Sequence, residues 1–288
     1  MKILGFFLTF FILNFHCHAQ ENTLQGLPIY YWQQSKFVNF GDYLALKIVE
    51  RIVGGEVTVC KNPHKPPKKI LSIGSVLIFA NTDDVIWGTG MNGKRMDLKD
   101  YKFTNLDIRS VRGPLTRDFI IDNFGINCPE VYGDPALLLP YFFPEFKKSE
   151  TPTYDYLIIP HYADEYLFPK SEYTNIVYPT DPWRTVIHKI LDSKFVISGS
   201  LHGIVVAEAY GIPARYLRVS THEPLYKYQD YYQGTNRPDF QYATSIEEAL
   251  FMGGEPPFEC NLKTLYESFP FEYWPDSDYI YPDFRRLE

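Results

Sequence analysis

The sequence predicts an α/β protein made of two halves, each a parallel sheet whose strands are joined by crossover helices. Short apolar runs of the kind that form buried strands alternate with helical segments along most of the chain. A stretch rich in proline, lysine and glutamate, Pro140–Tyr154, divides this alternation into residues 27–145 and 150–252. The chain has 288 residues, of which 45% are hydrophobic and 22% charged, and these values suit one large or two medium domains.

The chain begins with the features of a signal peptide, residues 1–19. Met1 and Lys2 precede an apolar run of thirteen residues, Ile3–Phe15, and Ala19 offers a small-residue cleavage site. We therefore expect the protein in the lumen of a secretory pathway, in the periplasm or outside the cell. An uncleaved N-terminal anchor is the alternative, although the run is shorter than the roughly 18 to 20 residues that span a bilayer. No later segment could cross a membrane.

The net charge and the cysteine content limit the classes of ligand that the protein could bind. A formal net charge of −7 argues against a nucleic-acid-binding surface, because phosphate backbones are held by clustered lysine and arginine. Three cysteines follow the leader, too few for a disulfide framework, and no histidine, cysteine and aspartate cluster has metal-ligand spacing. A small anionic substrate would therefore need a local basic pocket.

In the first half, five segments predict strands. They are Ile29–Trp32, Val57–Val59, Ile70–Phe79, Val85–Trp87 and a strand that ends within Val131–Pro135. Asp42 closes the loop after the first segment and is a good N-cap for a helix that continues to Val53. Val85–Trp87 leads directly into Gly88-Thr89-Gly90, where glycine allows the backbone to approach a ligand closely, so Gly90 is a candidate binding residue.

The most basic part of the chain follows. It contains Arg109, Arg112 and Arg117, and Pro114 starts a helix that continues to Phe124. An arginine side chain is always charged and donates two parallel hydrogen bonds to a carboxylate or a phosphate. Arg112 is therefore the first candidate for binding an anion and Arg109 a weaker one. A solvated charged face is the alternative.

The second half repeats the alternation of strands and helices. Its first predicted strands are Tyr156–Ile159 and Ile176–Tyr178. Asp181 and Pro182 provide the N-cap and the first residue of a helix that continues to Asp192. Ser245 and Glu248 form a capping box for a short last helix.

The tail, residues 253–288, is crowded with aromatic residues and prolines. Large aromatic side chains bury extensive apolar surface, so we expect the tail to pack across other elements. A platform that stacks on sugar rings is the alternative interpretation.

The most informative segment is the strand, turn and helix around His202. The apolar run Phe195–Ile197 is followed by small residues, and a helix starts at Leu201 and ends near Gly211. In an open α/β sheet, the carboxyl end of a strand and the amino end of the next helix face the ligand crevice, where free N–H groups favour anions. His202 lies at this position, and the amides near Ser200 could hold an anion. The alternative is a histidine hydrogen-bonded to a neighbouring carbonyl.

Five motifs occur in one order along the chain. They are Asn39-Phe40-Gly41-Asp42, Trp87-Gly88-Thr89-Gly90, Val111-Arg112-Gly113-Pro114, Gly133-Asp134-Pro135-Ala136, and Ser200-Leu201-His202-Gly203 with Gly211-Ile212-Pro213. Together they resemble the polysaccharide pyruvyl transferase family, and residues 262–271 resemble the close of its exopolysaccharide ketal-pyruvate transferase subgroup. The resemblance implies a glycosyltransferase-B-like arrangement of two Rossmann-like domains that face a cleft. It also implies phosphoenolpyruvate as the donor and a carbohydrate as the acceptor, with neither a metal nor a nicotinamide required.

The resemblance also implies roles for residues. His202 matches the family's catalytic histidine, and Arg112 matches an arginine that looks like the donor-binding partner. Many members carry arginine where this chain has Ser200, so a donor contact must come from elsewhere, for which Arg109 and Arg95 are candidates; the ketal-pyruvate subgroup commonly has serine there. Asp42 could bind an acceptor hydroxyl, with capping as its alternative role. The substrate-binding candidates are Ser200, Leu201, Arg109, Gly90, Asp42 and Asp134.

The leading hypothesis is a secreted or lumenal transferase that adds a pyruvyl ketal to a sugar, with His202 as acid and base and Arg112 as the anion clamp. Histidine, whose ordinary pKa is about 6.5, can exchange a proton near neutrality. Phosphoenolpyruvate is made in the cytoplasm, so the predicted leader requires that the donor be imported or replaced. The alternatives are a glycosyltransferase of the same architecture that uses a nucleotide-sugar, and a carbohydrate-binding protein without catalytic activity.

Overall fold

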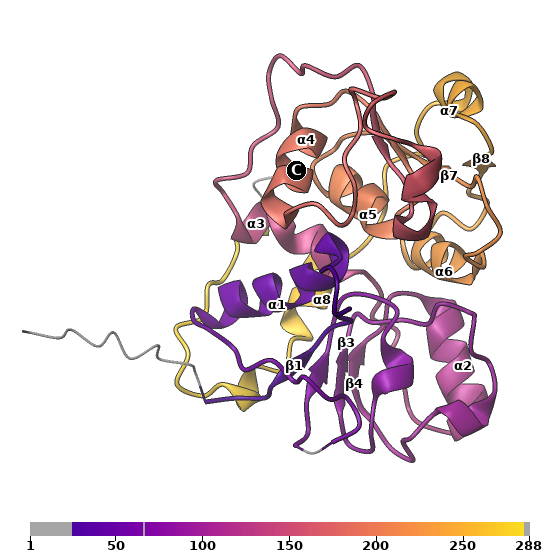
Figure 1. Cartoon of the computed structure of the whole chain (residues 1–288). Helices are drawn as coiled ribbons and strands as arrows, with labels where there is room; N and C mark the ends of the chain where they lie inside the picture. The colour runs from indigo at the N-terminus through magenta and orange to yellow at the C-terminus, as the bar shows by residue number, and fades with distance from the viewer. Residues whose placement is uncertain (1–24, 66, 285–288) are drawn as a thin grey trace, which may run out of the picture.

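The computed structural model describes residues 25–65 and 67–284, so the predicted signal peptide lies outside the described residues. These residues form an α/β structure with two four-stranded sheets, and every strand pair in both is parallel. Figure 1 shows the first sheet in the lower part of the molecule and the second in the upper part, with α1 where the two parts meet. The predicted mixed α/β class with parallel sheets is confirmed.

The first sheet has the strand order β1-β2-β3-β4. Its strands are β1 (Ile29–Tyr30), β2 (Ile70–Leu71), β3 (Val85–Trp87) and β4 (Asp107–Ser110), and its helices are α1 (Phe40–Val53), α2 (Pro114–Phe124), η1 (Leu77–Phe79) and η2 (Leu98–Asp100). Two predicted strands are reduced to single bridges, because only Val59 pairs with Ile29 and only Tyr132 with Val111. The rest of each segment runs as irregular chain along the sheet edge.

Helix α1 begins earlier than the sequence predicts. Its N-cap is Asn39, whose Oδ1 accepts a hydrogen bond from the Gly41 N–H at 3.0 Å, and Asp42 lies within the first turn. The predicted cap at Asp42 is therefore wrong. Asparagine and aspartate cap helices about equally well, and Asn39 comes first with the extended backbone that a cap requires. As a result, the Asp42 carboxylate is not used in capping.

The second sheet has the order β5-β6-β7-β8. Its strands are β5 (Leu157–Ile159), β6 (Val196–Ser198), β7 (Ala214–Leu217) and β8 (Tyr242–Ala243), and its helices are α4 (Trp183–Leu191), α5 (Leu201–Ala209), α6 (Tyr226–Gly234), α7 (Ile246–Met252) and η4 (Tyr162–Leu167). The predicted start of α5 is confirmed, and Gly211 takes the predicted left-handed conformation with a φ of +66°. Ser245 accepts from the Glu248 N–H, which confirms that half of the capping box.

Two local predictions in this half are wrong. The segment Ile176–Tyr178 forms only a bridge, from Ile176 to Ile158, instead of a strand. Pro182 is the N-cap of α4, and the Asp181 carboxylate instead accepts from the Tyr178 N–H at 2.9 Å. The reason is a competing local turn, because an aspartate side chain can bond to nearby backbone in place of a helix end.

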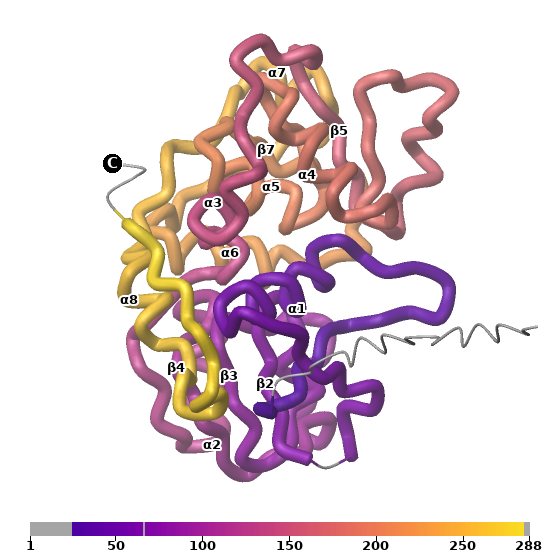
Figure 2. The backbone as a smooth tube through the Cα atoms, turned by 90° about the vertical axis from the view of Figure 1, so that its left-hand side faces the viewer, coloured from indigo at the N-terminus to yellow at the C-terminus, as the bar shows by residue number. Residues whose placement is uncertain are grey.

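The remaining short elements follow the first sheet or belong to the tail. They are η3 (Pro135–Leu138), α3 (Leu139–Phe142), α8 (Leu262–Glu267) and η5 (Phe271–Tyr273). Trp274 is fully buried, the ring of Phe269 lies 4.9 Å from that of Trp87, and the Trp87 Nε1–H donates to the Leu265 carbonyl at 2.9 Å. Figure 2 shows the yellow C-terminal segment beside β3 and β4. The aromatic rings of the tail named here are packing groups.

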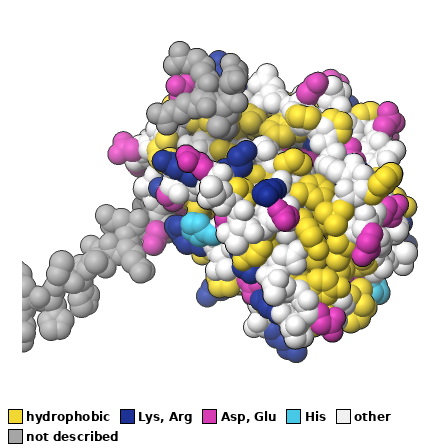
Figure 3. All heavy atoms as spheres, turned by 90° about the horizontal axis from the view of Figure 1, so that it is seen from above, with side chains coloured by type: hydrophobic (Ala, Val, Ile, Leu, Met, Phe, Trp, Pro, Cys, Tyr) yellow, Lys and Arg dark blue, Asp and Glu magenta, His cyan; other side chains and the backbone are white. Residues whose placement is uncertain are grey.

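The sequence predicts neither a nucleic-acid-binding surface nor a membrane-spanning segment after the leader. On the face shown in Figure 3, lysine and arginine side chains are scattered among acidic and hydrophobic ones and form no extended basic patch. Within residues 25–65 and 67–284, none of the helices combines the length and the apolar composition that crossing a bilayer requires.

Candidate active site

A pocket of about 300 Å³ lies between the two sheets. The chain reaches it after six of the strands: at Asn39 after β1, Ser75 after β2, Lys94 after β3, His161 after β5, Ser200 after β6 and Glu223 after β7. The carboxyl ends of parallel strands form the ligand crevice of an α/β sheet, so the location is the one that the topology favours. Of the predicted site residues, five line this pocket: His202, Ser200, Leu201, Asp42 and Arg95.

His202 is clamped at the bottom of the pocket. It is the second residue of α5, and its Nε2 lies 3.4 Å from the Oδ2 of Asp134; neither atom has a hydrogen-bond partner among the described residues. The Nδ1 edge of the ring faces Gly41, where an added Cβ would lie only 2.0 Å from Nδ1. Nε2 therefore faces a buried carboxylate, in place of the neighbouring carbonyl of the alternative interpretation.

Asp134 lies behind His202 and does not line the pocket. Its side chain is fully buried, and its Oδ1 accepts from the Ala136 N–H at 2.9 Å, which fixes the carboxylate at the start of η3. A carboxylate held in this way can orient an imidazole ring beside it. The structure thus brings Asp134 to the catalytic candidate but not to a substrate.

Asp42 lies in the same part of the pocket. Burial raises the pKa of its carboxyl from 3.8 to about 6, with His202 and Lys227 opposing the rise and Asp134 adding to it. A carboxyl with such a pKa is divided between its two protonation states slightly below neutrality. Asp42 can therefore donate or accept a hydrogen bond, or a proton, at this site.

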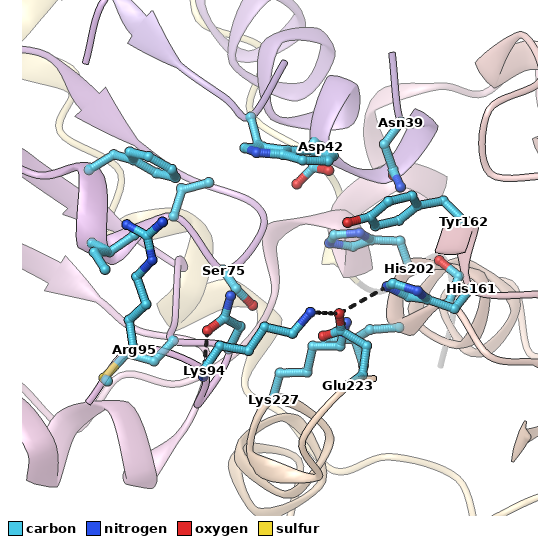
Figure 4. Close-up of a pocket in the computed structure, with 18 of the residues that line it drawn as sticks. Asn39, Asp42, Ser75, Lys94, Arg95, His161, Tyr162, His202, Glu223 and Lys227 are labelled. Carbon is cyan, nitrogen blue, oxygen red and sulfur yellow. Dashed lines mark hydrogen bonds and ion pairs between the residues drawn. The ribbon is translucent and has the colours of Figure 1, made fainter. Parts of the chain in front are cut away.

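The opposite wall of the pocket carries cations. Lys94 and Arg95 lie on the loop after β3, and Lys227 lies in the first turn of α6. Glu223 pairs with Lys94, and its Oε2 lies 2.9 Å from the Nζ of Lys227. Burial lowers the pKa of Lys227, and the charge of Glu223 opposes that shift. Figure 4 shows Lys94, Lys227 and Glu223 on one side, Asn39, Asp42 and Tyr162 on the other, and His202 between them.

His161 is a second histidine in the pocket, and it is held neutral. Burial and the charge of Lys227 lower its pKa to about 3, although Glu223 opposes the shift. Its Nδ1 accepts from the Ala163 N–H at 3.3 Å, so Nε2 carries the proton and faces Glu223 at 3.4 Å. In this state His161 can donate a hydrogen bond but contributes no charge.

Arg112 does not reach the pocket, contrary to its predicted role as a clamp. Its guanidinium is fully buried, with Nη2 3.0 Å from Asp230 Oδ2 and Nη1 donating to Ser75 Oγ at 2.9 Å. Asp230, on α6, also accepts from the N–H and the hydroxyl of Thr116. Arg112 therefore supports the wall that Ser75 lines. Gly90 makes room for it, because a Cβ at Gly90 would lie 2.6 Å from the Arg112 Cζ.

Arg109 is also placed away from the pocket. Its Nε donates to Asp107 Oδ1 at 2.6 Å, and its guanidinium also pairs with Glu272 of the tail. Successive side chains of a strand point to opposite faces of the sheet, so a basic segment does not bring all its arginines to one place. The prediction that Arg109 binds substrate is not supported by its position.

Three functional candidates were missed in the sequence. Lys94 and His161 follow the strands β3 and β5, so the rule that ligands bind at carboxyl ends of strands could have identified both. Lys227 could not be found in this way, since α6 was not predicted. That helix buries tyrosines, including Tyr228 and Tyr231, in place of the aliphatic stripe that marks most amphipathic helices.

Comparisons with known proteins identify a family and two relatives. The family model described as polysaccharide pyruvyl transferase matches residues 11–221. An uncharacterised protein of Acanthamoeba polyphaga mimivirus is 32% identical over 200 residues, which are 64% of this chain and 65% of that protein. The succinoglycan biosynthesis protein ExoV of Rhizobium meliloti (strain 1021) is 30% identical over 238 residues, 78% of this chain and 71% of that protein.

A solved structure shows a weaker likeness. It belongs to a functionally uncharacterised protein of Klebsiella pneumoniae subsp. pneumoniae, is 14% identical and covers 77% of this chain and 94% of its own. The TM-score is 0.42.

Proposed function

From the premise that the chain belongs to the polysaccharide pyruvyl transferase family, and is thus a transferase, we propose that it moves a pyruvyl group from phosphoenolpyruvate to a sugar as a cyclic ketal. The acceptor is a sugar unit of a glycan or polysaccharide. The observation that carries the proposal is His202, held against a buried carboxylate at the bottom of a pocket whose opposite wall is cationic.

The reaction needs the transfer of two protons and the departure of one anion. A proton is added to the methylene carbon of the donor, and the oxygen of one sugar hydroxyl bonds to the adjacent carbon. A second hydroxyl of the same sugar then bonds to that carbon as the phosphate oxygen leaves. The two hydroxyl protons balance the proton taken up by the methyl group and the proton that neutralises the departing phosphate.

In this proposal His202 exchanges these protons. Asp134 orients the ring, as a buried carboxylate does for histidine in other acid and base sites. Asp42 has a pKa of about 6, so near neutral pH it can accept a proton from a reacting hydroxyl and release it again.

The anionic donor is bound by the cationic wall in place of Arg112. Lys94, Arg95 and Lys227 face the space in which its phosphate and carboxylate would lie, and the first amides of α5 add donors at Leu201. This set supplies the contact that Ser200 leaves open. Arg112 serves as a positioning residue through Ser75.

We also propose the finer points of architecture and location. Two parallel sheets whose carboxyl ends meet at one pocket support a glycosyltransferase-B-like arrangement. The composition of residues 1–19 supports a lumenal, periplasmic or secreted protein, which then requires a supply of donor in that compartment.

The test is phosphate release from phosphoenolpyruvate by the purified protein, with galactosides, glucosides and mannosides as acceptors. We expect release that depends on a sugar and is lost in His202→Ala, while the variant stays folded. Stabilisation against heat by a nucleotide-sugar, with no effect of phosphoenolpyruvate, would instead favour a glycosyltransferase. A folded protein that releases no phosphate with any acceptor contradicts the proposal.

A further inference from the structure

Three aromatic side chains, which we call the rim cluster, lie together at the edge of the pocket. They are Trp32, Phe37 and Tyr162. The ring centroids of Trp32 and Tyr162 are 5.5 Å apart and those of Phe37 and Tyr162 are 5.7 Å apart. Trp32 and Phe37 follow β1 of the first sheet, whereas Tyr162 starts η4 after β5 of the second. The rim cluster therefore connects the two halves beside the space between them.

The rim cluster is not part of the folding core. Among the described residues, Phe37 and Tyr162 belong to none of the three buried apolar clusters, and Trp32 only packs against one of them from outside. Trp87 and Trp274, by contrast, are completely buried. Partly buried rings beside a pocket keep apolar surface that a ligand can cover.

Asn39 and Asp42 line the pocket on the same side as Tyr162 of the rim cluster, and neither carries a positive charge. Asn39 uses its Oδ1 to cap α1, which leaves its side-chain NH₂ for a ligand, and Asp42 can both donate and accept. In Figure 4 both lie on the same side of the pocket as Tyr162 and opposite Lys94. A pyranose has an apolar C–H face and a hydroxyl edge, so it matches this wall, whereas an anion matches the lysines.

Building on the proposed function, we propose that the rim cluster is the acceptor subsite. A neutral hexopyranoside stacks on Trp32 and Tyr162 and directs its pair of hydroxyls toward Asn39 and Asp42, with His202 beyond them. The donor lies across the pocket against Lys94. This arrangement brings the hydroxyls and the donor carbon together above one histidine.

The test measures sugar binding directly. Saturation-transfer NMR on the full chain, with methyl glycosides of galactose, glucose and mannose as probes, should show binding of at least one glycoside. Trp32→Ala should weaken that binding about tenfold, the ratio that about 1.4 kcal/mol produces. Trp32→Phe should keep most of it. Trp183→Ala is the matched control for Trp32→Ala, because Trp183 is also partly buried but packs on Phe143 and Phe146.

Kinetics separate this inference from the proposed function. In Trp32→Ala the KM for the sugar should rise about tenfold while the KM for phosphoenolpyruvate stays unchanged. The inference is overturned if Trp32→Ala binds glycosides as the wild type does, or if none of the three binds to the wild type. If glycoside binding depends on Trp32 but no phosphate is released, the subsite stands and pyruvyl transfer fails. If transfer occurs with an unchanged sugar KM in Trp32→Ala, transfer stands and the subsite fails.

Discussion

Two helices, one from each half of the molecule, begin at the pocket, and their first turns differ. Helix α1 starts with a side-chain cap, because Asn39 accepts the Gly41 N–H. Helix α5 starts at Ser200, whose side chain makes no capping hydrogen bond. The first N–H groups of any helix need acceptors from outside the helix. A side chain supplies such an acceptor for α1, but the Ser200 side chain supplies none for α5. This difference indicates that the first N–H groups of α5 are available to bind an anion.

The largest effect on turnover is expected from removing the histidine of α5. His202→Ala should lower kcat about a thousandfold, since a general acid and base contributes roughly 10²- to 10⁴-fold. Asp134→Asn keeps the shape but removes the charge behind the ring, and we expect about a hundredfold loss. Phosphate release measures both, with thermal unfolding as the check on folding. A His202→Ala variant with near wild-type turnover would remove the functional half of the comparison.

The contact between the two helix starts can be broken from the α1 side. Gly41→Ala places a Cβ 2.0 Å from the His202 Nδ1, so either the ring or the helix must shift. Overpacking of this kind costs about 1 to 3 kcal/mol in free energy of unfolding, and turnover should fall with the displaced ring. Urea unfolding measures the cost. In the double variant with His202→Ala the stability cost should fall but not vanish, because the Cβ that remains at position 202 lies 2.5 Å from the added Cβ. A double variant that shows the full cost of Gly41→Ala would place the strain away from the imidazole ring.

Asp42, in the first turn of α1, should make the stability of the protein depend on pH. Burial raises its folded-state pKa from 3.8 to about 6, so the folded chain keeps a proton that the unfolded chain has lost. The charged carboxylate therefore destabilises the fold increasingly from about pH 4 to about pH 6 and fully above that. Asp42→Asn should raise the free energy of unfolding at pH 7.5 by about 1 to 3 kcal/mol and leave it unchanged below about pH 4. Denaturant unfolding at both pH values, with the exposed Asp276→Asn as control, decides this.

The smallest effect separates the two caps directly. Asn39→Ala removes the α1 cap and should lower the free energy of unfolding by about 1 kcal/mol. Ser200→Ala removes no capping bond and should lower it by no more than roughly a few tenths of a kcal/mol.

Thermal unfolding of both variants against the wild type measures the difference. Equal losses in the two variants would mean that Ser200 stabilises α5 by another contact and would remove the contrast between the helices.

Where local signals agreed, the sequence predicted the structure well. The segment from Val196 to Leu217 folds as strand, helix and strand because apolar runs, small turn residues and Gly211 all favour the same boundaries. The α1 cap was mispredicted because Asn39 and Asp42 are both good caps three residues apart, and nothing in the local sequence decides between them.

The site was predictable only in part, because side-chain direction depends on tertiary contacts. His202 was found through its place after a strand. Arg112 lies near the site, but its partner Asp230 is 118 residues later in the chain, on a helix that no apolar periodicity indicated. Lys227 was missed on that same helix. Sequence patterns thus located the edge of the sheet but not which charges point into the pocket.

The carboxylate of Asp230 has a consequence for how the molecule melts. It lies on α6 of the second half, and its contacts with Arg112 and Thr116 reach into the first half. If either half unfolded alone, this buried ion pair would be broken, and breaking a buried pair costs about 3 to 5 kcal/mol. We therefore expect calorimetry to show one cooperative transition, with equal calorimetric and van't Hoff enthalpies, for the two sheets together.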